Sequence, residues 1–409
     1  MTKQEMAVAQ GRVTATPQNP ALRPGPSTHV RLHSLTGLRF VAALMVFCYH
    51  SSLQIPTLAV FGYGATGSHW ARIASNAGAV GVTFFFVLSG FVLTWSARVN
   101  DTVRAFWRRR LLKIYPNYVV AWVLAMVLFA ASSTPAWRAV LNLFMLQVWV
   151  PDFFTNFSVD PPSWSLGAEA FFYACFPLLL RLADRIEPSR LKYWAAGTFA
   201  AIVAAPVLAY AFLSENPKVP GNFDASPLQY WLVYILPPVR MFDFALGILV
   251  ARLVLTGRWR NIGMANSALL LAATYVATSY VPYLYAQRVL CVIPMVLLIA
   301  AAAVADSRGR SSFLASRPMR WLGDISFAFY LLHFIVLTMV MKYARKLFDE
   351  QFFSLTTGIA LLAVALVVTV AVAHLLYCGF ERPITRRWSM RRNPSADRGG
   401  QPTPVSAKH

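Results

Sequence analysis

The feature that most constrains this chain is the recurrence of long apolar segments separated by short polar ones. Ten segments are long enough to cross a bilayer as helices, which takes about 18 largely apolar residues each. Because a bilayer offers the backbone no hydrogen-bonding partners, we expect these segments to be helical. The pattern predicts an all-α, polytopic membrane bundle of about ten transmembrane helices, over residues 34–54, 77–97, 116–133, 164–183, 193–213, 230–253, 263–281, 287–305, 325–345 and 353–378.

The composition supports a membrane protein and changes the meaning of the positive charge. Hydrophobic residues make up 57% of the 409 residues and charged residues only 13%, whereas a soluble domain has about 25% charged residues. In a soluble protein the net charge of +21 would suggest a nucleic-acid partner. Here we expect no nucleic-acid partner, because the basic residues are sorted between alternate loops.

This sorting predicts the orientation of the bundle. With the N-terminus in the cytoplasm, 28 of the 37 lysines and arginines fall in cytoplasmic segments and 7 in outer ones, as membrane proteins generally show. We therefore predict a multi-pass protein of the cytoplasmic membrane with both termini inside. A single membrane domain, 33–385, is expected between a polar, proline-rich head, 1–32, and a basic tail, 386–409, both predicted to be disordered.

Three local features refine this outline. Segment 139–150 is short for a span and is interpreted as a membrane-surface or re-entrant helix. Pro237 and Pro238 should kink the sixth span. The four cysteines lie within apolar runs and show no metal-ligand spacing, so we predict no metal site.

The first span carries two ionisable residues, which are costly inside a membrane and therefore point to function. Arg39 and His50 would lie about 16 Å apart along a helix, Arg39 near the inner face and His50 near the outer one. Ser165 and Glu169 share one helix face in the outer half of the fourth span. We expect Glu169 to lie beside His50, because a carboxylate orients an imidazole and raises its basicity as a general base.

Other polar residues lie near mid-depth in their spans. Ser89 lies in the second span, and Arg240 and Asp243, three residues apart, can pair in the sixth. We interpret the Arg240–Asp243 pair mainly as a helix-packing pair and His333 of the ninth span mainly as a structural residue.

The densest basic run lies in the cytoplasmic stretch RAFWRRRLLKIYPNY. Its cations can bind phosphates and its aromatic rings can stack on a purine, and coenzyme A carries both groups. The alternative is that the run is only the positive-inside signal. The residues concerned are Trp107, Arg108, Arg109, Arg110, Lys113 and Tyr115.

Seven short motifs, in order along residues 33–385, resemble the acyltransferase-3 family of membrane acyltransferases. One is an arginine followed after ten residues by a histidine, which here are Arg39 and His50. The seven are LTGLRFVAALMVFCYH, GVTFFFVLSGFVLT, RRRLLKIYP, PPSWSLGAEAFFY, RMFDFALGILVA, LGDISFAFYLLHF and FERP.

The resemblance implies transfer of an acyl group, usually from acyl-coenzyme A, to a hydroxyl of a carbohydrate or small natural product. Acyl-CoA is then a co-substrate, and no permanently bound cofactor is expected. The family motifs fall on the catalytic candidates Arg39, His50 and Glu169. For the donor we expect contacts from Arg109, Arg110, Lys113 and Tyr115. For the acceptor we expect contacts from Ser89, Trp164, Ser165 and Arg240.

One departure concerns Lys113, where the family usually has an arginine. Lysine keeps the charge but loses the bidentate guanidinium fork, so the geometry of phosphate contact differs. Arg108 or Arg109 could compensate.

The sequence leaves several functions open. The opening RLHSLTGLRF resembles the branch of the family that modifies macrolide-type antibiotics, and a surface polysaccharide or glycolipid is the alternative acceptor. Besides a hydroxyl-bearing acceptor, the partners expected are acyl-CoA and membrane lipid. A secondary transporter would also account for ten spans with buried charges. A membrane scaffold would not account for the cost of those charges. The sequence does not indicate an oligomeric state.

Overall fold

The structure, a computed structural model, describes residues 31–62, 64–97, 101–219, 223–310 and 312–389. Every regular element within these ranges is helical, so the all-α prediction is confirmed for this part of the chain. The α-helices are α1 (His33–Ser52), α2 (Ala65–Ala74), α3 (Ala77–Trp95), α4 (Val103–Ala125), α5 (Ala136–Leu143), α6 (Phe153–Asn156), α7 (Trp164–Arg185), α8 (Leu191–Phe212), α9 (Pro227–Tyr230), α10 (Pro237–Leu255), α11 (Met264–Ala277), α12 (Tyr283–Arg288), α13 (Val292–Ser307), α14 (Arg317–Phe348), α15 (Leu355–Leu376) and α16 (Arg382–Ser389).

Among the described residues, nine helical stretches are long and apolar enough to cross a membrane. They coincide with nine of the ten predicted spans. The tenth, 263–281, contains α11, which has 14 residues and is followed by a 3-10 turn, Thr278–Tyr280. At about 1.5 Å per residue α11 is about 21 Å long, shorter than a hydrocarbon core of about 30 Å. Segment 139–150 is not a span: it contains the end of α5 and a 3-10 turn, Gln147–Trp149.

The centre of the bundle is formed by α3, which packs against α1 on one side and α10 on the other, while α1 also packs against α14. Of the 18 residues that form the apolar part of the stretch Ala65–Trp95, 83% are buried. The corresponding share is 22% in α8 and in the stretch that contains α15. Gly90 of α3 faces the carbonyl of Phe244, and Gly247 of α10 faces the carbonyl of Val87; a Cβ atom at either glycine would overlap that oxygen. Small residues allow helices to approach this closely.

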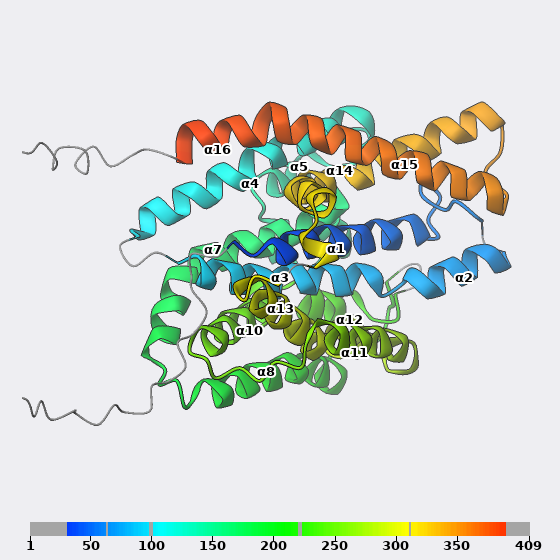
Figure 1. Cartoon of the computed structure of the whole chain (residues 1–409). Helices are drawn as coiled ribbons and strands as arrows, with labels where there is room; N and C mark the ends of the chain where they lie inside the picture. The colour runs from blue at the N-terminus through cyan, green and yellow to red at the C-terminus, as the bar shows by residue number, and fades with distance from the viewer. Residues whose placement is uncertain (1–30, 63, 98–100, 220–222, 311, 390–409) are drawn as a thin grey trace, which may run out of the picture.

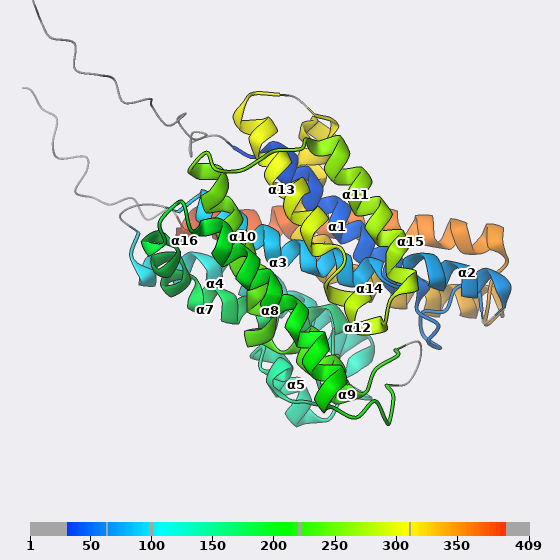
Figure 2. The ribbon, with the colours of Figure 1, turned by 90° about the horizontal axis from the view of Figure 1, so that it is seen from below.

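The outer helices each accompany a central partner. α8 packs along α10, α11 along α13, and α15 along α14, as Figure 1 and the turned view of Figure 2 show. Many large apolar side chains on these outer helices are exposed on the surface of the bundle, where a membrane protein contacts lipid. This arrangement leaves the polar side chains of the central helices buried within the bundle.

The predicted kink at Pro237 is confirmed. A π-helical turn, Trp231–Ile235, precedes the break, and α10 begins at Pro237 itself. Arg288 of α12 spans the break, because its Nη1 donates to the carbonyl of Val233 at 2.8 Å and its Nη2 to that of Val239 at 2.5 Å. Arg288, at the start of the predicted span 287–305, is fully buried, and its side chain gives hydrogen bonds to carbonyls on both sides of the break.

The predicted pairing of Arg240 with Asp243 is also confirmed. Arg240 Nη1 lies 3.2 Å from Asp243 Oδ2, and Arg288 Nη2 lies 3.8 Å from the same oxygen. Arg240 Nη2 donates to Thr83 of α3 at 2.9 Å. All three charged side chains are fully buried, so this cluster ties α10 to α3 and α12.

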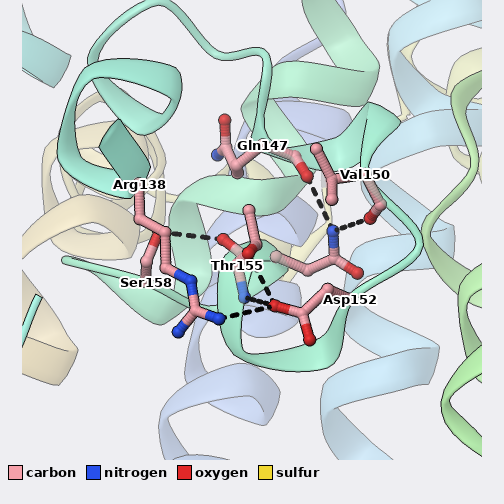
Figure 3. A network of polar contacts seen from close by, with 7 residues as sticks. Arg138, Gln147, Val150, Asp152, Thr155 and Ser158 are labelled. Carbon is pink, nitrogen blue, oxygen red and sulfur yellow. Dashed lines mark hydrogen bonds and ion pairs between the residues drawn. The ribbon is translucent and has the colours of Figure 1, made fainter. Parts of the chain in front are cut away.

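The connection from α4 to α7 is held by its own polar network (Figure 3). Asp152 accepts hydrogen bonds from the backbone and side chain of Thr155, at 2.8 and 2.6 Å, and pairs with Arg138 at 3.1 Å. Asn156 donates to the carbonyl of Gln147 at 2.7 Å. These contacts fix the loop that leads into the first turn of α7.

Both ends of the described chain lie at one end of the bundle. Figure 1 shows α16 and the starts of α1 and α4 on the left, and α2 and the α14–α15 connection on the right. Residues 386–389 belong to α16, so the predicted disordered tail begins too early in the chain. The rest of the predicted head and tail, 1–30 and 390–409, lies outside the described residues, and the orientation in the membrane stays a prediction.

Candidate active site

A cavity of about 860 Å³ lies among α1, α3, α4, α7, α14 and the segment from α15 to α16. It is basic toward the end of the bundle that holds α16, where Arg382 and Arg386 line it, and aromatic further in, at Phe85 and Tyr330. Seven of the predicted site residues line this cavity: Arg39, Ser89, Arg109, Arg110, Lys113, Ser165 and Glu169.

One face of α7 supplies a polar stripe along the cavity, because Ser165, Glu169 and Tyr173 are spaced by four residues. Tyr173 donates to Glu169 Oε1 at 2.5 Å, and Ser89 of α3 donates to the same oxygen at 3.0 Å. The predicted common face of Ser165 and Glu169 is thus confirmed.

The predicted contact between Glu169 and His50 is wrong. Glu169 bonds to Ser89 and Tyr173 and lies within electrostatic range of Arg39. The sequence placed the two residues at similar depth, but the face of α7 that carries Glu169 turns toward α3 and the basic part of the cavity. Glu169 therefore belongs with the cations of the cavity rather than with the imidazole.

The partner of His50 is a second histidine. His50 Nδ1 lies 2.9 Å from Nε2 of His333 on α14, and both side chains are buried, at 8% and 0% exposure. The two rings are 5.0 Å apart between centroids. Phe334 packs edge-on against His50 at 5.3 Å, and Phe329 stacks on His333 at 6.1 Å.

Carbonyl oxygens determine which nitrogens of this pair carry protons. His333 Nδ1 lies 2.6 Å from the carbonyl of Tyr330, which can only accept, so Nδ1 carries the proton. A neutral His333 then presents Nε2 as an acceptor, and His50 Nδ1 donates to it and toward the carbonyl of Val46 at 3.1 Å. His50, neutral in this assignment, keeps its lone pair on Nε2, as a general base requires.

His333 is the functional candidate that sequence reasoning missed, since we interpreted it as structural. The available signal was its position in LGDISFAFYLLHF, one of the seven motifs. A single intramembrane histidine gives no information about its neighbours, so only the packing of α1 against α14 reveals the pair.

Tyr330 connects the cavity to the histidines. Its side chain lines the cavity, its hydroxyl bonds to Ser165 Oγ at 2.8 Å, and its ring centroid lies 5.8 Å from that of His333. The hydroxyl also donates to the carbonyl of Pro162 at 3.1 Å. Tyr330 therefore links Ser165 of α7 to the imidazole pair.

The basic part of the cavity is partly neutralised. Arg109 pairs with Asp101, and Arg110 lies 6.0 Å from the ring of Tyr173. Lys113 lies within electrostatic range of Glu381 and Arg39. A surface with more cations than carboxylates suits a ligand with several negative groups at one end.

Four predicted site residues lie outside the cavity lining. His50 contacts His333, whose ring lies 5.8 Å from that of Tyr330 in the cavity wall. The hydroxyl of Tyr115 faces the carbonyl of Leu143 at 3.4 Å, so the predicted stacking of Tyr115 on a purine in this cavity is not supported. Trp164 packs against Phe86, Phe157 and Tyr234. Arg240 lies over Phe86 and Tyr234 at 4.9 and 5.2 Å and faces the Asp243 cluster.

Fold and site together define a class: a multi-pass helical membrane protein whose basic cavity leads toward a buried histidine pair. The profile of the acyltransferase-3 family, described as an acyltransferase domain, matches residues 32–378. The chain belongs to this family, and the resemblance of the seven motifs is thereby confirmed.

Three relatives show how the similarity is distributed. The chain is 39% identical to acyltransferase MdmB of Streptomyces mycarofaciens over 90% of its length and 95% of that protein. It is 26% identical to YrhL of Bacillus subtilis, which is named for peptidoglycan O-acetylation, and 23% identical to O-acetyltransferase OatA of Staphylococcus aureus. Each of these matches covers 87% of the chain, but only 55% of YrhL and 57% of OatA. No solved structure gives a significant match. Family and relatives make the chain a membrane O-acyltransferase.

Proposed function

We propose that this protein transfers an acyl group from acyl-CoA to a hydroxyl of a small natural product of the macrolide type. The observation that carries the chemistry is the free lone pair on His50 Nε2, held in that tautomer by His333 and two backbone carbonyls. The donor is supported by the basic cavity, which offers cations to phosphates at one end and aromatic walls further in.

The reaction uses His50 first as a base and then as an acid. His50 Nε2 takes the proton of the acceptor hydroxyl while the oxygen attacks the thioester carbonyl carbon. The carbon–sulfur bond then breaks, and the imidazolium returns its proton to the leaving sulfur. The products are the acyl ester and free coenzyme A. His333 stabilises the imidazolium by accepting from Nδ1, much as a carboxylate does in a catalytic triad.

The other site residues bind and position the donor. Arg109, Arg110 and Lys113 hold phosphates at the basic end, and Arg39 lies further along the path from there toward His50. Glu169 and Ser89 form one hydrogen-bonded group in the wall of this path. The buried position of the histidine pair keeps water from the thioester, which limits hydrolysis of the donor.

Two observations favour a small natural product over a cell-surface carbohydrate as acceptor. The opening RLHSLTGLRF resembles the antibiotic-modifying branch. Similarity to MdmB is also higher, and extends over more of the relative, than similarity to YrhL. The likeness to YrhL nevertheless makes peptidoglycan O-acetylation the second candidate.

The proposal is tested with membranes that contain the protein, incubated with acetyl-, propionyl- or longer acyl-CoA and with either a macrolide or a peptidoglycan fragment. We expect release of free coenzyme A that depends on the macrolide, and its loss in His50→Ala and Arg39→Ala at equal expression. Full activity in His50→Ala would refute the mechanism. Accumulation of a solute without release of coenzyme A would identify a transporter instead.

A further inference from the structure

A second cavity, of about 640 Å³, lies between the starts of α1 and α14 and the end of α3. Arg39, Val92, Trp321 and Asp324 line both this cavity and the larger one. The two are therefore neighbouring compartments at the basic end of the bundle. We name the second one the α14 compartment; its characteristic side chains are Arg31, Trp95, Arg317, Arg320 and Trp321.

The α14 compartment has more cations per carboxylate than the larger cavity, although the excess of cations over carboxylates is three in both. Four arginines line it against the single carboxylate of Asp324, whereas six basic residues line the larger cavity against three carboxylates. Neither Arg317 nor Arg320 forms an ion pair with another described residue, and Arg320 Nε is buried without a hydrogen-bond partner there. These guanidinium groups are available to an anion.

The start of α14 adds a helix dipole to these charges. α14 has 32 residues and begins at Arg317, with Ser316 as its N-cap. The Ser316 side chain caps no backbone amide, and its Oγ is buried with no partner among the described residues. Unsatisfied amides and the positive end of a helix dipole bind phosphate well, and here they adjoin Arg317 and Arg320.

Two tryptophans give the compartment a surface for a flat ring. Trp321 is 42% exposed and borders both compartments, and its Nε1 donates to His374 at 3.3 Å, which orients the indole. Trp95 is 3% exposed, and its Nε1 has no partner in the described chain. Indole faces stack on purines, and a buried donor without a partner favours a polar ligand.

The walls of the compartment are held rigidly. Gly37 of α1 packs on the carbonyl of Leu314, and Gly323 of α14 packs on that of Thr36, so that a Cβ atom at either glycine would overlap backbone. Ser34 donates from its amide and hydroxyl to Asp306, at 2.8 and 2.7 Å. A compartment held in this way loses little entropy when it binds a ligand.

We propose that the α14 compartment binds the 3′-phosphate and adenine of acyl-CoA. This inference rests on the proposed function, which makes acyl-CoA the donor. Arg317, Arg320 and the start of α14 contact the 3′-phosphate, and Trp321 stacks on the adenine. The 5′-diphosphate then lies at the junction of the compartments, near Arg39, Arg110 and Lys113, and the pantetheine arm extends along the larger cavity toward Ser165.

The test compares coenzyme A with 3′-dephospho-coenzyme A, which lacks only the proposed ligand group. Equilibrium binding of both to the purified full-length protein is measured, with KM and kcat for their acetyl thioesters. We expect the unaltered protein to prefer coenzyme A by about 10- to 100-fold, as one or two charge-assisted hydrogen bonds predict. The double variant Arg317→Gln/Arg320→Gln should lower this preference to about twofold or less, with kcat unchanged.

Arg260→Gln is the matched control, because Arg260 is exposed and lines neither compartment. It should keep the full preference. The inference is overturned if the double variant, folded as judged by gel filtration and thermal unfolding, keeps the original preference, or if the unaltered protein binds and turns over both donors equally. A protein that binds no coenzyme A at all would refute the acyl-CoA donor as well, so the two failures are distinguishable.

A phospholipid headgroup offers similar phosphate chemistry, and a further arm separates it from the nucleotide. Mixed micelles with phosphatidylglycerol are added to the unaltered protein and to the double variant. We expect no competition with coenzyme A in either. The opposite outcome would assign the compartment to lipid and overturn the inference. In that outcome the unaltered protein retains phosphatidylglycerol and the double variant does not, while the double variant still discriminates between coenzyme A and 3′-dephospho-coenzyme A.

Discussion

The hydrogen bond between His50 and His333 gives each imidazole a separate task, and these tasks can be tested one side chain at a time. His333→Ala removes the acceptor that fixes the tautomer of His50 and stabilises its imidazolium. We expect kcat for acyl transfer to fall by about 100-fold, within the range of general-base contributions, while KM for acyl-CoA stays nearly unchanged. His333→Gln, whose amide oxygen can accept from Nδ1, should retain more activity. His69→Ala, at an exposed histidine of α2, is the control, and a His333→Ala enzyme with normal kcat would contradict the assignment.

A second residue-scale prediction concerns Asp160, just before α7. It is fully buried, and neither carboxylate oxygen has a hydrogen-bond partner in the described part of the chain. Burial raises the pKa of Asp160 well above its usual range. The folded protein thus holds this proton more tightly than the unfolded chain, so the free energy of unfolding decreases as the pH rises above the unfolded-state pKa.

The substitution Asp160→Asn removes this contribution to the pH dependence of the free energy of unfolding. At about pH 8 the variant should be more stable than the unaltered protein by about 1 kcal/mol or more, and near pH 4 the difference should shrink. Thermal unfolding in detergent at both pH values measures the effect, and Glu350→Gln at an exposed site should change stability at neither. Equal destabilisation by Asp160→Asn at both pH values would show that the carboxylate is stabilised by a contact instead.

The residue-scale predictions from sequence succeeded where helical periodicity sufficed. The common face of Ser165 and Glu169 and the pairing of Arg240 with Asp243 follow from spacings of four and three residues along one helix. Contacts between helices are different. Depth in the membrane placed Glu169 near His50, but depth does not say toward which neighbour a helix face turns, and in the structure that face turns to Ser89.

At the scale of helices, the contact of α3 with α10 depends on two glycines. Gly247→Ala would place a methyl group against the carbonyl of Val87, which neither backbone can avoid without a shift of the whole helix. We expect a loss of about 1–3 kcal/mol, typical of overpacking, seen as a lower thermal unfolding midpoint in detergent. Because α3 carries Ser89 and α10 adjoins α7, activity should fall in parallel.

Gly197→Ala is the matched control within the same protein. Gly197 lies in α8, and a Cβ atom there would meet nothing within 4 Å. Alanine forms helices better than glycine by about 1 kcal/mol, so this variant should be neutral or slightly more stable. If both glycine variants lost the same stability, the close approach of α3 and α10 would not be the cause.

Helix existence was predictable because length and hydropathy decide it. The detailed ends were less predictable. α11 ends after 14 residues and a 3-10 turn replaces its last turn, although the apolar run continues. The proline break before α10 was predicted from Pro237, but the side chain that spans it, Arg288, lies some 50 positions later in the sequence. Hydropathy cannot predict this contact, because it does not report hydrogen bonds between a side chain and a carbonyl distant in the sequence.

At the scale of the whole molecule, the arrangement of charge decides which end meets the cytoplasm. Arg382 and Arg386 of α16 line the larger basic cavity. Figure 1 shows α16 at one end of the bundle and the α14–α15 connection at the other. If the positive-inside rule holds here, a charged donor enters from the cytoplasm, and the histidine pair lies toward the far side of the bundle. The orientation therefore determines from which compartment of the cell the acyl group is drawn.

Cys378 offers a direct test of this orientation. It is exposed and lines the larger cavity near its basic end. In a variant with Cys48, Cys175 and Cys291 changed to alanine, a membrane-impermeant maleimide should label Cys378 in inverted membrane vesicles but not in right-side-out ones. Coenzyme A should slow the labelling, because the donor would occupy the same cavity.

The complementary label is Glu350→Cys in a background without other cysteines, since Glu350 is exposed in the α14–α15 connection at the opposite end. It should react from the outer side only. The reverse labelling pattern at both positions would show that the bundle has the opposite orientation in the membrane. The basic cavities would then open outside the cell, where acyl-CoA is absent. The donor, and not only the topology, would then have to be reconsidered, because the charge that attracts phosphates and the charge that orients the protein are carried by the same arginines.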